Sequence, residues 1–502
     1  MDVAKIIDGV PGAVLRRGER GVPITSITYD SRQVGPGTLF VALPGERFDG
    51  HEFVEAAIEA GAAAVLVEEG RDGPWEGTVL EVGSTRGSLA RLGSVFYQAP
   101  SSELKVLGIT GTNGKTTCTY LLEALFQAAG YTTGVIGTVE YRWADRRVAA
   151  PNTTPDGLVL QSLLRRMADD GVEVVVMEVS SHGLASGRVD EVVFQGALFT
   201  NLSQDHLDFH RTMEEYRDAK RLLFTKYLPA AGESAVAVVN ADDQEGEALA
   251  ALMESTGDVQ VVTYGFSKAS AVQGRSLRSG VDGVSFEVRA GEETFAVASP
   301  MPGGFNAENV LGVTALAKAM GVPVATIRRG LEEFSGVPGR MERVVGLADG
   351  PVDGPAVFVD YAHTPDALKR ALMTLRPLTR GRLWVVFGCG GDRDRGKRPV
   401  MGAVAAEHAD LVHLTSDNPR REEPSEIIEE IGAGIDEGQG KVVVNVERRE
   451  AIELAVTGAS GDDVVLIAGK GHETYQEIRG ERRDFDDREV AAAALRSRGA
   501  TP

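Results

Sequence analysis

The chain has 502 residues, 43% of them hydrophobic and 25% charged, an ordinary globular composition with room for roughly three domains of about 150 residues each. Its formal net charge of −21 argues against a protein that holds nucleic acid or an anionic membrane surface. Two cysteines are too few for a disulfide framework, and no apolar run approaches the roughly 18 residues that span a bilayer. The N-terminus lacks a signal-peptide core, so we expect a soluble, cytoplasmic protein. We also expect it to act as a monomer.

The first predicted domain, residues 1–102, places short strands around one helix. Strands are predicted over 24–32, 38–43 and 63–69, and the helix over 51–62. The segment ends in YQAPSSELK, whose proline and polar residues are typical of a linker. We therefore predict a small N-terminal α/β domain.

The second predicted domain, residues 103–337, has the βα alternation of a mostly parallel sheet with helices on both faces. It opens with the strand KVLGIT, the turn GTNGK and the helix TTCTYLLEALFQAAG. Further strands are predicted over 132–138, 172–179, 196–201 and 235–240, followed by a hairpin over 284–290 and 294–299 and a helix from about Asn306. A glycine/proline junction, FSGVPGR, ends the domain.

The third predicted domain, residues 338–502, alternates strands and helices again. Strands are predicted over 356–362, 383–391, 411–418, 441–446 and 463–471, with helices such as 364–375 and 424–435 between them. This pattern indicates a C-terminal Rossmann-like α/β unit.

The segment GITGTNGKTT, residues 108–117, follows a strand and opens a helix, as a phosphate-binding loop requires. Lys115 supplies positive charge, and the Thr116 hydroxyl can hold Mg²⁺. Backbone N–H groups and the helix N-terminus would face the β- and γ-phosphates of ATP along Gly111, Thr112, Asn113, Gly114, Lys115, Thr116 and Thr117. The alternative is a glycine-rich turn with a solvated lysine, but the order of strand, turn, GKTT and helix favours nucleotide binding.

Ordered motifs along nearly the whole chain resemble those of the Mur ligase family, which also includes folylpolyglutamate synthases. Besides TGTNGKTT, they are DSR (30–32), NTTPD (152–156), MEVSSHGL (177–184), NLSQDHLDFH (201–210), YRDAKRLLF (216–224), GGFNAENVLG (303–312), GVPGRME (336–342), DYAHTPDAL (360–368) and AGKGHETYQ (468–476). MEVSSHGL, FGCGGDRDRGKRP and DNPR resemble the family members that add the third residue of the cell-wall peptide.

The resemblance implies an ATP- and Mg²⁺-dependent ligase of peptidoglycan precursor synthesis. ATP would phosphorylate the D-glutamate side chain of UDP-N-acetylmuramoyl-L-alanyl-D-glutamate, and the amine of meso-diaminopimelate would displace phosphate from the acyl phosphate. This order makes chemical sense because a carboxylate is a poor electrophile until one oxygen becomes a leaving group, and because cations must offset the repulsion between two anions. L-Lysine as the substrate, a sister ligase such as a folylpolyglutamate synthase, and a non-catalytic nucleotide-binding regulator are the alternatives.

The resemblance implies that Lys115, Glu178, His206 and Lys220 are catalytic, and that the last three lie with Thr116 at the Mg²⁺ sites. Glu178 ends the apolar strand VEVVVMEV, at the edge where parallel sheets place ligands. By position alone it could equally be a solvated strand-end residue. His206 follows the strand GALFTN, where a lone histidine is more often structural or solvated.

Lys220 shares one helix face with Tyr216 and Phe224, at i−4 and i+4. Burial there would favour the neutral amine that CO₂ needs to form a carbamate. The spacing alone favours a lysine that snorkels to solvent, whereas the resemblance implies N6-carboxylysine at Lys220.

The resemblance also implies contacts with the nucleotide and with the UDP-sugar. On the nucleotide side it implicates Asn306, Asn309 and Arg340, together with Asp360 and His363, although a helix cap and polar loop residues remain the alternative. For the UDP-sugar it implicates Ser31, Glu46, Arg47, Phe48, Asn152, Thr153, Thr154, Ser180 and Arg188.

DNPR follows the strand LVHLTS, and the resemblance implies a diaminopimelate pocket formed by Arg393, Asp417, Asn418, Pro419, Arg420, Gly469 and Glu473. Arginine can grip a carboxylate through two hydrogen bonds, and Asp or Asn can accept the hydrogens of an ammonium. Lysine lacks the second ammonium–carboxylate head of meso-diaminopimelate. The alternative is an Asx-Pro turn that ends a strand, and both interpretations can hold together.

Overall fold

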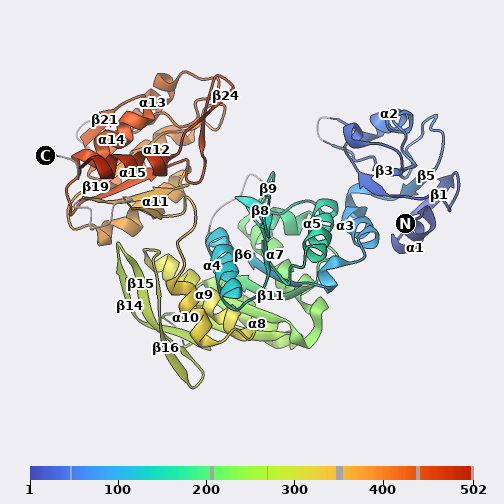
Figure 1. Ribbon diagram of the computed structural model, residues 1–502, viewed down its shortest axis with the longest axis horizontal. Coiled ribbons are helices and arrows are strands. Elements are labelled where there is room, and N and C mark those ends of the chain that lie inside the picture. The colour runs from blue at the N-terminus through green and yellow to red at the C-terminus, as the bar shows by residue number, and fades with distance from the viewer. Residues whose placement is uncertain (46–47, 204–208, 268, 346–353, 437–440, 499–502) are drawn as a thin grey trace. The chain divides into compact units, whose positions relative to one another are not determined.

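The computed structural model describes residues 1–45, 48–203, 209–267, 269–345, 354–436 and 441–498 (Figure 1). Over these ranges the protein is α/β, with a sheet of at least five strands in each predicted domain, which confirms the predicted fold class. Packing divides the chain into two compact units, residues 1–264 with 315–322 and residues 265–314 with 323–502. The domain boundaries expected after residues 102 and 337 stay a prediction.

The N-terminal sheet has the strand order β1-β5-β4-β3-β2, with β1 antiparallel to β5 and the other pairs parallel. Its strands are β1 (Val14–Arg17), β2 (Ser26–Thr28), β3 (Thr38–Val41), β4 (Ala64–Glu68) and β5 (Val79–Val82), and its helices are α1 (Val3–Gly9), α2 (Val54–Glu59) and α3 (Thr85–Phe96). Helices α1 and α3 pack on one face and α2 on the other. The predicted helix and the strands predicted over 38–43 and 63–69 are present. The strand predicted over 24–32 is limited to Ser26–Thr28, because the Asp30 side chain accepts a hydrogen bond from Arg32 N and caps a 3₁₀ turn at Ser31–Gln33.

The central sheet is parallel over β13-β12-β11-β6-β10-β7 and continues antiparallel through β8 and β9. Its strands are β6 (Lys105–Thr110), β7 (Thr133–Ile136), β8 (Glu140–Trp143), β9 (Arg146–Ala149), β10 (Val174–Glu178), β11 (Phe194–Phe199), β12 (Val236–Asn240) and β13 (Gln260–Gly265). The helices are α4 (Lys115–Ala128), α5 (Gly157–Asp169), α6 (Ser181–Ala185), α7 (Met213–Leu222) and α8 (Gln244–Thr256). Because β6 lies between β10 and β11, the segments after these three strands meet at one edge of the sheet.

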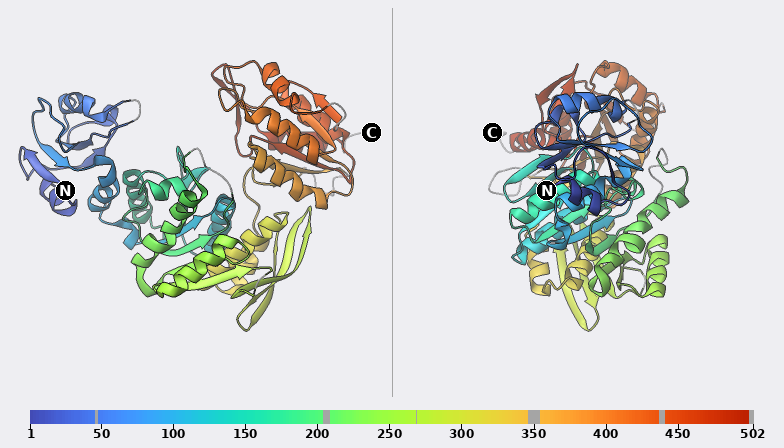
Figure 2. Two further views of the ribbon diagram at one scale, coloured as in Figure 1. Left: turned by 180° about the vertical axis from the view of Figure 1, so that it is seen from behind. Right: turned by 90° about the vertical axis from the view of Figure 1, so that its right-hand side faces the viewer.

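Three antiparallel strands, yellow-green in Figure 2, follow: β14 (Val272–Gly280), β15 (Gly283–Ala290) and β16 (Glu293–Ser299). The sequence predicts the last two of them as a hairpin. Helices α9 (Gly304–Ala319) and α10 (Val324–Glu332) come next.

The C-terminal sheet has the order β17-β18-β22-β19-β20-β21 and is parallel except for β17. Its strands are β17 (Glu342–Val344), β18 (Ala356–Asp360), β19 (Leu383–Phe387), β20 (Leu411–Leu414), β21 (Lys441–Val444) and β22 (Val464–Ala468). Helices α11 (Pro365–Leu375), α12 (Lys397–His408) and α13 (Pro424–Gly432) pack on one face, and α14 (Arg448–Gly458) and α15 (Asp487–Arg498) on the other (Figure 1).

This doubly wound arrangement fits the predicted Rossmann-like unit. A small hairpin of β23 (Tyr475–Ile478) and β24 (Glu481–Asp484) follows β22. In the part of the chain that the structure describes, no helix is long and apolar enough to cross a membrane.

Candidate active site

The predicted phosphate loop leaves the carboxyl end of β6 as a tight turn. Gly111 has a φ of 147°, and a Cβ there would lie 1.9 Å from Thr200 Oγ1, so this position requires glycine. Asn201, just after β11, accepts hydrogen bonds from the backbone N–H groups of Thr112 (2.8 Å) and Asn113 (3.0 Å). The neighbouring strand therefore fixes the path of the loop.

Lys115 begins α4, directly after Gly114, which adopts a left-handed conformation with φ 86°. Its Nζ donates to the carbonyl oxygens of Gly111 (2.9 Å) and Thr112 (3.0 Å), so the ammonium lies over the loop. The first N–H groups of α4 have no partners inside the helix, and the positive end of the helix dipole faces the same loop. This arrangement can bind an anion such as a nucleotide phosphate.

Glu178 ends β10 beside this loop and is only 1% exposed. Its Oε1 accepts hydrogen bonds from Thr116 Oγ1 (3.0 Å) and Thr138 N (2.9 Å), and its Oε2 accepts one from Thr138 Oγ1 (3.0 Å). The carboxylate is thus oriented toward the amino end of α4 by neutral donors.

The residues around Glu178 fit a Mg²⁺ ion. A buried carboxylate is costly unless it is paired, and among the described residues its hydrogen-bond partners carry no charge. Carboxylate and hydroxyl oxygens suit Mg²⁺, which usually keeps waters and substrate phosphates as its other ligands. His206, another of the four predicted Mg²⁺ ligands, lies outside the described residues. Inside the described residues no three His, Cys, Asp or Glu side chains gather closely enough to hold a metal.

Lys220 lies on the buried face of α7 and is 1% exposed. Its Nζ donates to Gly111 O (2.8 Å) and lies 4.3 Å from the centre of the Tyr216 ring. The helix changes to a π-helical turn, Leu223–Tyr227, shortly after Lys220, an irregularity that is frequent at functional sites. The amine therefore lies against the phosphate loop and not in solvent.

Four residues implicated in UDP-sugar binding gather behind Glu178. Thr153 and Thr138 share a hydrogen bond between their hydroxyls (3.0 Å), and Thr154 Oγ1 donates to Glu178 O (2.9 Å). Ser180 Oγ accepts a hydrogen bond from Thr154 Oγ1 (3.2 Å) and caps α6. The fourth residue, Arg188, donates from Nη1 to the carbonyl of Thr154 at 2.9 Å.

The remaining residues predicted for the UDP-sugar lie elsewhere or are not described. Asn152 is exposed, and its carbonyl accepts a hydrogen bond from Tyr141. Ser31 lies in the 3₁₀ turn Ser31–Gln33, and Phe48 is 70% exposed. Glu46 and Arg47 lie outside the described residues.

The predicted nucleotide residues of the second unit form two groups. Asn306 and Asn309 are buried near the start of α9, where Asn309 Nδ2 donates to Asn306 Oδ1 at 3.3 Å. The guanidinium of Arg340 lies 4.9 Å from the centre of the Tyr361 ring, next to Asp360. Burial raises the pKa of Asp360, and the positive charge of Arg340 acts in the opposite direction.

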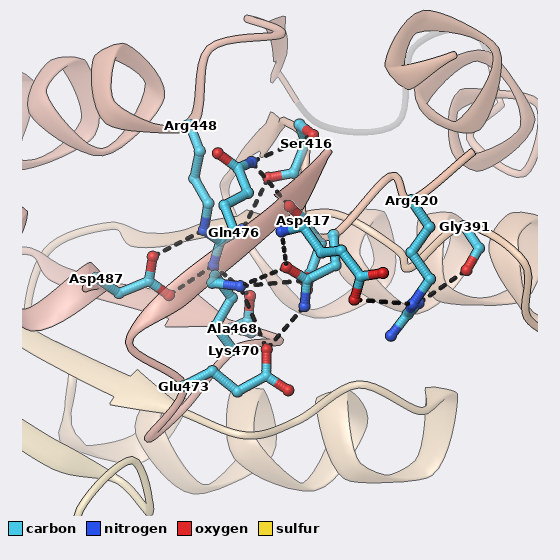
Figure 3. A network of polar contacts seen from close by, with 12 residues as sticks. Gly391, Ser416, Asp417, Arg420, Arg448, Ala468, Lys470, Glu473, Gln476 and Asp487 are labelled. Carbon is cyan, nitrogen blue, oxygen red and sulfur yellow. Dashed lines mark hydrogen bonds and ion pairs between the residues drawn. The ribbon is translucent and has the colours of Figure 1, made fainter. Parts of the chain in front are cut away.

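Most of the residues predicted for the amino-acid pocket lie on the segments after β20 and β22, which contact each other (Figure 3). Asp417 and Asn418 are 7% and 3% exposed, and Asn418 Nδ2 donates to Glu473 Oε2 at 2.8 Å. Gly469 has a φ of 113°, and a Cβ there would lie 2.5 Å from Asp417 Oδ2. This close approach requires glycine and brings the AGKGHE loop against the DNPR segment.

Arg420 lies at one side of this network of polar contacts, next to Gly391 (Figure 3). It has a left-handed φ of 52°, its Nη1 donates to Gly391 O (2.8 Å), and its Nε lies 3.8 Å from Glu477 Oε2. Arg393 is exposed on the loop after β19. The structure thus brings together Asp417, Asn418, Gly469 and Glu473. The Arg420 side chain instead contacts Gly391 and Glu477, and Arg393 is exposed.

The site contains charged residues that the sequence analysis missed. Lys470, fully buried, donates from Nζ to Asn418 Oδ1 at 2.9 Å. Arg448 and Asp487 form a buried ion pair through two hydrogen bonds of 2.7 Å, and Arg448 also donates to the carbonyls of Ser416 and Ala468, which follow β20 and end β22. Lys470 could have been proposed as a site residue from the sequence, because it lies between two glycines in the motif AGKGHETYQ.

The chain matches the models of three Mur ligase domains. Residues 23–88 match "Mur ligase family, catalytic domain", residues 109–317 match "Mur ligase middle domain", and residues 339–471 match "Mur ligase, glutamate ligase domain".

Full-length relatives that bear the name UDP-N-acetylmuramoyl-L-alanyl-D-glutamate–2,6-diaminopimelate ligase match as well. The protein of Geobacillus thermodenitrificans is 43% identical over 99% of this chain and 100% of its own length, and that of Gloeobacter violaceus is 46% identical over 95% and 96%. A solved structure of such a ligase is 33% identical, covers 100% of both chains and has a TM-score of 0.72. Because domain models and full-length relatives agree along the chain, the protein belongs to the Mur ligase family.

Proposed function

We propose that the protein is an ATP-dependent ligase that adds meso-diaminopimelate to UDP-N-acetylmuramoyl-L-alanyl-D-glutamate in peptidoglycan precursor synthesis. The contact between the segments after β20 and β22 carries the proposal, because Asn418 of DNPR holds the carboxylate of Glu473 and the same segment supplies the carboxylate of Asp417 and the guanidinium of Arg420. The distal head of diaminopimelate has a carboxylate and an ammonium, which complement these charges. The relatives named for this reaction support the same substrates.

The phosphate loop and its neighbours would carry the activation step. Lys115 and the amino end of α4 bind the ATP phosphates, while Thr116 and Glu178, with His206, would hold Mg²⁺. When bound, Mg²⁺ offsets the repulsion between ATP and the substrate carboxylate. The D-glutamate side-chain oxygen then attacks the γ-phosphorus, ADP leaves, and an acyl phosphate forms.

The second step joins the two substrates. The neutral amine of diaminopimelate attacks the acyl carbon, and the tetrahedral intermediate collapses with loss of phosphate and a proton. Arg188, near Thr154 and Ser180, would pair with an anionic group of the UDP-sugar substrate. Asp417, Asn418, Arg420 and Glu473 would hold the distal head of the amino acid.

We further propose that Lys220 is carbamylated to N6-carboxylysine. Its burial against Gly111 supports this, since the modification would convert a buried cation into a carboxylate-like anion close to the proposed Mg²⁺ site. Thr116, Glu178, His206 and the modified Lys220 would then supply oxygen and nitrogen ligands.

The protein would act as a cytoplasmic monomer. The proposed reaction uses ATP and a UDP-linked precursor, both of which are available in the cytoplasm. One chain carries all the groups assigned to the two steps, so the reaction requires no residue from a second copy.

Phosphate release with purified protein tests the function. We expect release, with a product of the mass of the UDP-muramoyl tripeptide, only when ATP, UDP-N-acetylmuramoyl-L-alanyl-D-glutamate and meso-diaminopimelate are all present. Release with L-lysine as efficient as with diaminopimelate would overturn the amino-acid assignment. Release with a folate and glutamate in place of the UDP-sugar would identify a folylpolyglutamate synthase, and no release under any condition would favour a regulator.

A further inference from the structure

Lys470 is a buried cation next to three residues of the proposed amino-acid site (Figure 3). Its Nζ lies 2.9 Å from Asn418 Oδ1, 3.3 Å from Glu473 Oε2 and 3.8 Å from Asp417 Oδ1. One ammonium with three N–H groups therefore faces all three polar side chains that would receive the substrate ammonium.

Lys470 cannot itself be a substrate contact, because its side chain has no exposed surface. Gly469 lies directly against the Asp417 side chain, and the lysine that follows it is covered by protein. Glu473, by contrast, keeps 20% of its side chain exposed, so a ligand can reach this carboxylate.

The hydrogen bonds of Lys470 decide which way the Asn418 amide points. Asn418 Oδ1 accepts from Lys470 Nζ and from Glu477 N, each at 2.9 Å, which uses both of its lone pairs. The Asn418 Nδ2 group therefore points the other way, and it donates to Glu473 Oε2. Through this chain of contacts Lys470 sets the orientation of Asn418 and, through Asn418, that of Glu473.

The charge of Lys470 also offsets two carboxylates that the pocket holds close together. Asp417 and Glu473 both lie within 4 Å of the same ammonium, so each would repel the other if Lys470 were neutral. The strand end that carries Asp417 is held from behind by Arg448, which donates to Ser416 O. The backbone is thus fixed independently of Lys470, whereas the side chains of Asn418 and Glu473 are oriented by their contacts with this lysine.

We propose that Lys470 is a positioning residue for the amino-acid substrate, which pre-orders Asn418 and Glu473 without touching the ligand. This inference rests on the proposed ligase function and assigns a role within its amino-acid site. When the side chains of a site are already ordered, less binding free energy is lost in ordering them as the ligand binds. Loss of Lys470 should therefore weaken the binding of the amino acid and not that of the other substrates.

Steady-state kinetics of Lys470→Met, Glu473→Gln and the double variant test the inference. We expect Lys470→Met to raise the KM for diaminopimelate by about tenfold or more while the KM values for ATP and the UDP-sugar stay within about twofold. Because both single changes disturb the same contacts, their effects on KM should fail to add in the double variant. The double variant also removes one positive and one negative charge together, so it provides a folded protein if Lys470→Met alone does not fold, and its KM should then match that of Glu473→Gln.

Asp463→Asn is the matched control. Asp463 is also a buried charge of this sheet, but it lies at the amino end of β22, where it accepts hydrogen bonds from Arg382 N and Ser460 N. We expect this variant to lose stability and to keep the wild-type KM for diaminopimelate.

Three outcomes would overturn the inference: an unchanged KM for diaminopimelate in a folded Lys470 variant, equal increases for all three substrates, or a rise in KM in Asp463→Asn that matches Lys470→Met. In the folded double variant, a KM clearly above that of Glu473→Gln, with fully additive effects, would contradict the proposed route through Glu473. These results require an active wild-type protein. If the wild type releases no phosphate with any amino acid, the proposed function fails and the inference fails with it.

Discussion

Lys220 is the residue whose burial bears most directly on the proposed chemistry. Replacing it with alanine removes the amine that would carry the carbamate and leaves space beside Gly111 O. We expect Lys220→Ala to lower kcat by roughly 100-fold or more, because an anion at the proposed Mg²⁺ site is lost. Excess bicarbonate or a short carboxylic acid should restore part of the rate by supplying a carboxylate to the same space.

Lys226 is the control for this experiment. It follows Lys220 along the same helical segment, but its side chain is 54% exposed and pairs with Asp190 at the surface. Lys226→Ala should keep the wild-type rate and show no response to carboxylic acids. A fully active Lys220→Ala protein would refute both the carbamate and a catalytic role for this lysine.

Arg420 should select the amino acid. If its guanidinium pairs with the distal carboxylate of diaminopimelate, Arg420→Ala leaves that carboxylate desolvated without a partner, at a cost of about 2–5 kcal/mol. The KM for diaminopimelate should rise about tenfold or more while the KM for ATP is unchanged. Lysine has no distal carboxylate and should lose less.

Steady-state kinetics with both amino acids on both proteins measure this difference. Arg479→Ala is the control, because the Arg479 side chain is 78% exposed and pairs with Glu423 outside the pocket. Equal losses for lysine and diaminopimelate would mean that Arg420 serves the fold, consistent with its hydrogen bond to Gly391 O.

Strand β20 carries a structural weakness directly before the DNPR segment. His413 is buried against Trp384, and both of its ring nitrogens lack a hydrogen-bond partner among the described residues. Burial lowers the pKa of His413, so in the folded protein the ring stays neutral at a pH where the unfolded chain already binds a proton.

The free energy of unfolding should therefore fall as the pH drops below about 6.5, the ordinary histidine value, until the lower pKa of the folded state is reached. His413→Leu should remove this contribution, and it also eliminates two unsatisfied polar atoms, so we expect equal or greater stability at pH 6. Urea unfolding of both proteins between pH 5.5 and 8 measures the difference. Identical pH slopes would show that His413 does not titrate on unfolding.

Elements with a strong local pattern were predictable from the sequence. KVLGIT is β6 over its whole length, and the helix and strands around the phosphate loop follow as expected. Helix α3 was missed because Gly87 and Gly93 lower its helix propensity, although Gly93 lets the helix approach Gln161 of α5. Strand β14 was missed because VQGRSLRSG does not alternate apolar and polar residues, and its pairing with β15 forms it.

The position of a site residue was predictable only where it follows from that residue's place on a single strand. Glu178 could be placed at the edge of the sheet from its position at the end of an apolar strand. The ion pair of Arg448 with Asp487 could not be predicted, because the two residues lie 39 positions apart and no local sequence pattern distinguishes either one. The role of Lys470 likewise depends on a loop that folds back onto DNPR.

For the whole molecule, the net charge of −21 opposes the approach of ATP and a UDP-linked substrate, which are both anions. Local cations must therefore outweigh the global field at each binding position. Lys115 and the amino end of α4 supply this charge at the phosphate loop, Arg188 beside Thr154, and Arg420 in the amino-acid pocket. Elsewhere on the surface the net negative charge repels these anions only weakly, because salt screens the repulsion. The repulsion therefore does not prevent binding at the three cationic positions.

The division into two compact units predicts how the whole chain unfolds. Each unit has its own buried core, and a chain of 502 residues exceeds the size at which two-state unfolding is usual. We expect calorimetry to give more than one transition, with a calorimetric enthalpy larger than the van't Hoff enthalpy. All the residues proposed to hold diaminopimelate lie in the second unit, so this ligand should raise the midpoint of one transition and leave the other in place.

At a ligand concentration 100 times the Kd the stabilisation should approach about 2.7 kcal/mol. At the same concentration a tenfold weaker Kd leaves only about 1.4 kcal/mol of stabilisation, so Arg420→Ala should reduce the shift by about half or more without removing the transition itself. This result separates ligand binding from a general change in stability. A single transition that moves as a whole, with equal calorimetric and van't Hoff enthalpies, would show that the two units unfold together. In that case the proposed amino-acid site would be coupled to the phosphate loop through the stability of the entire chain.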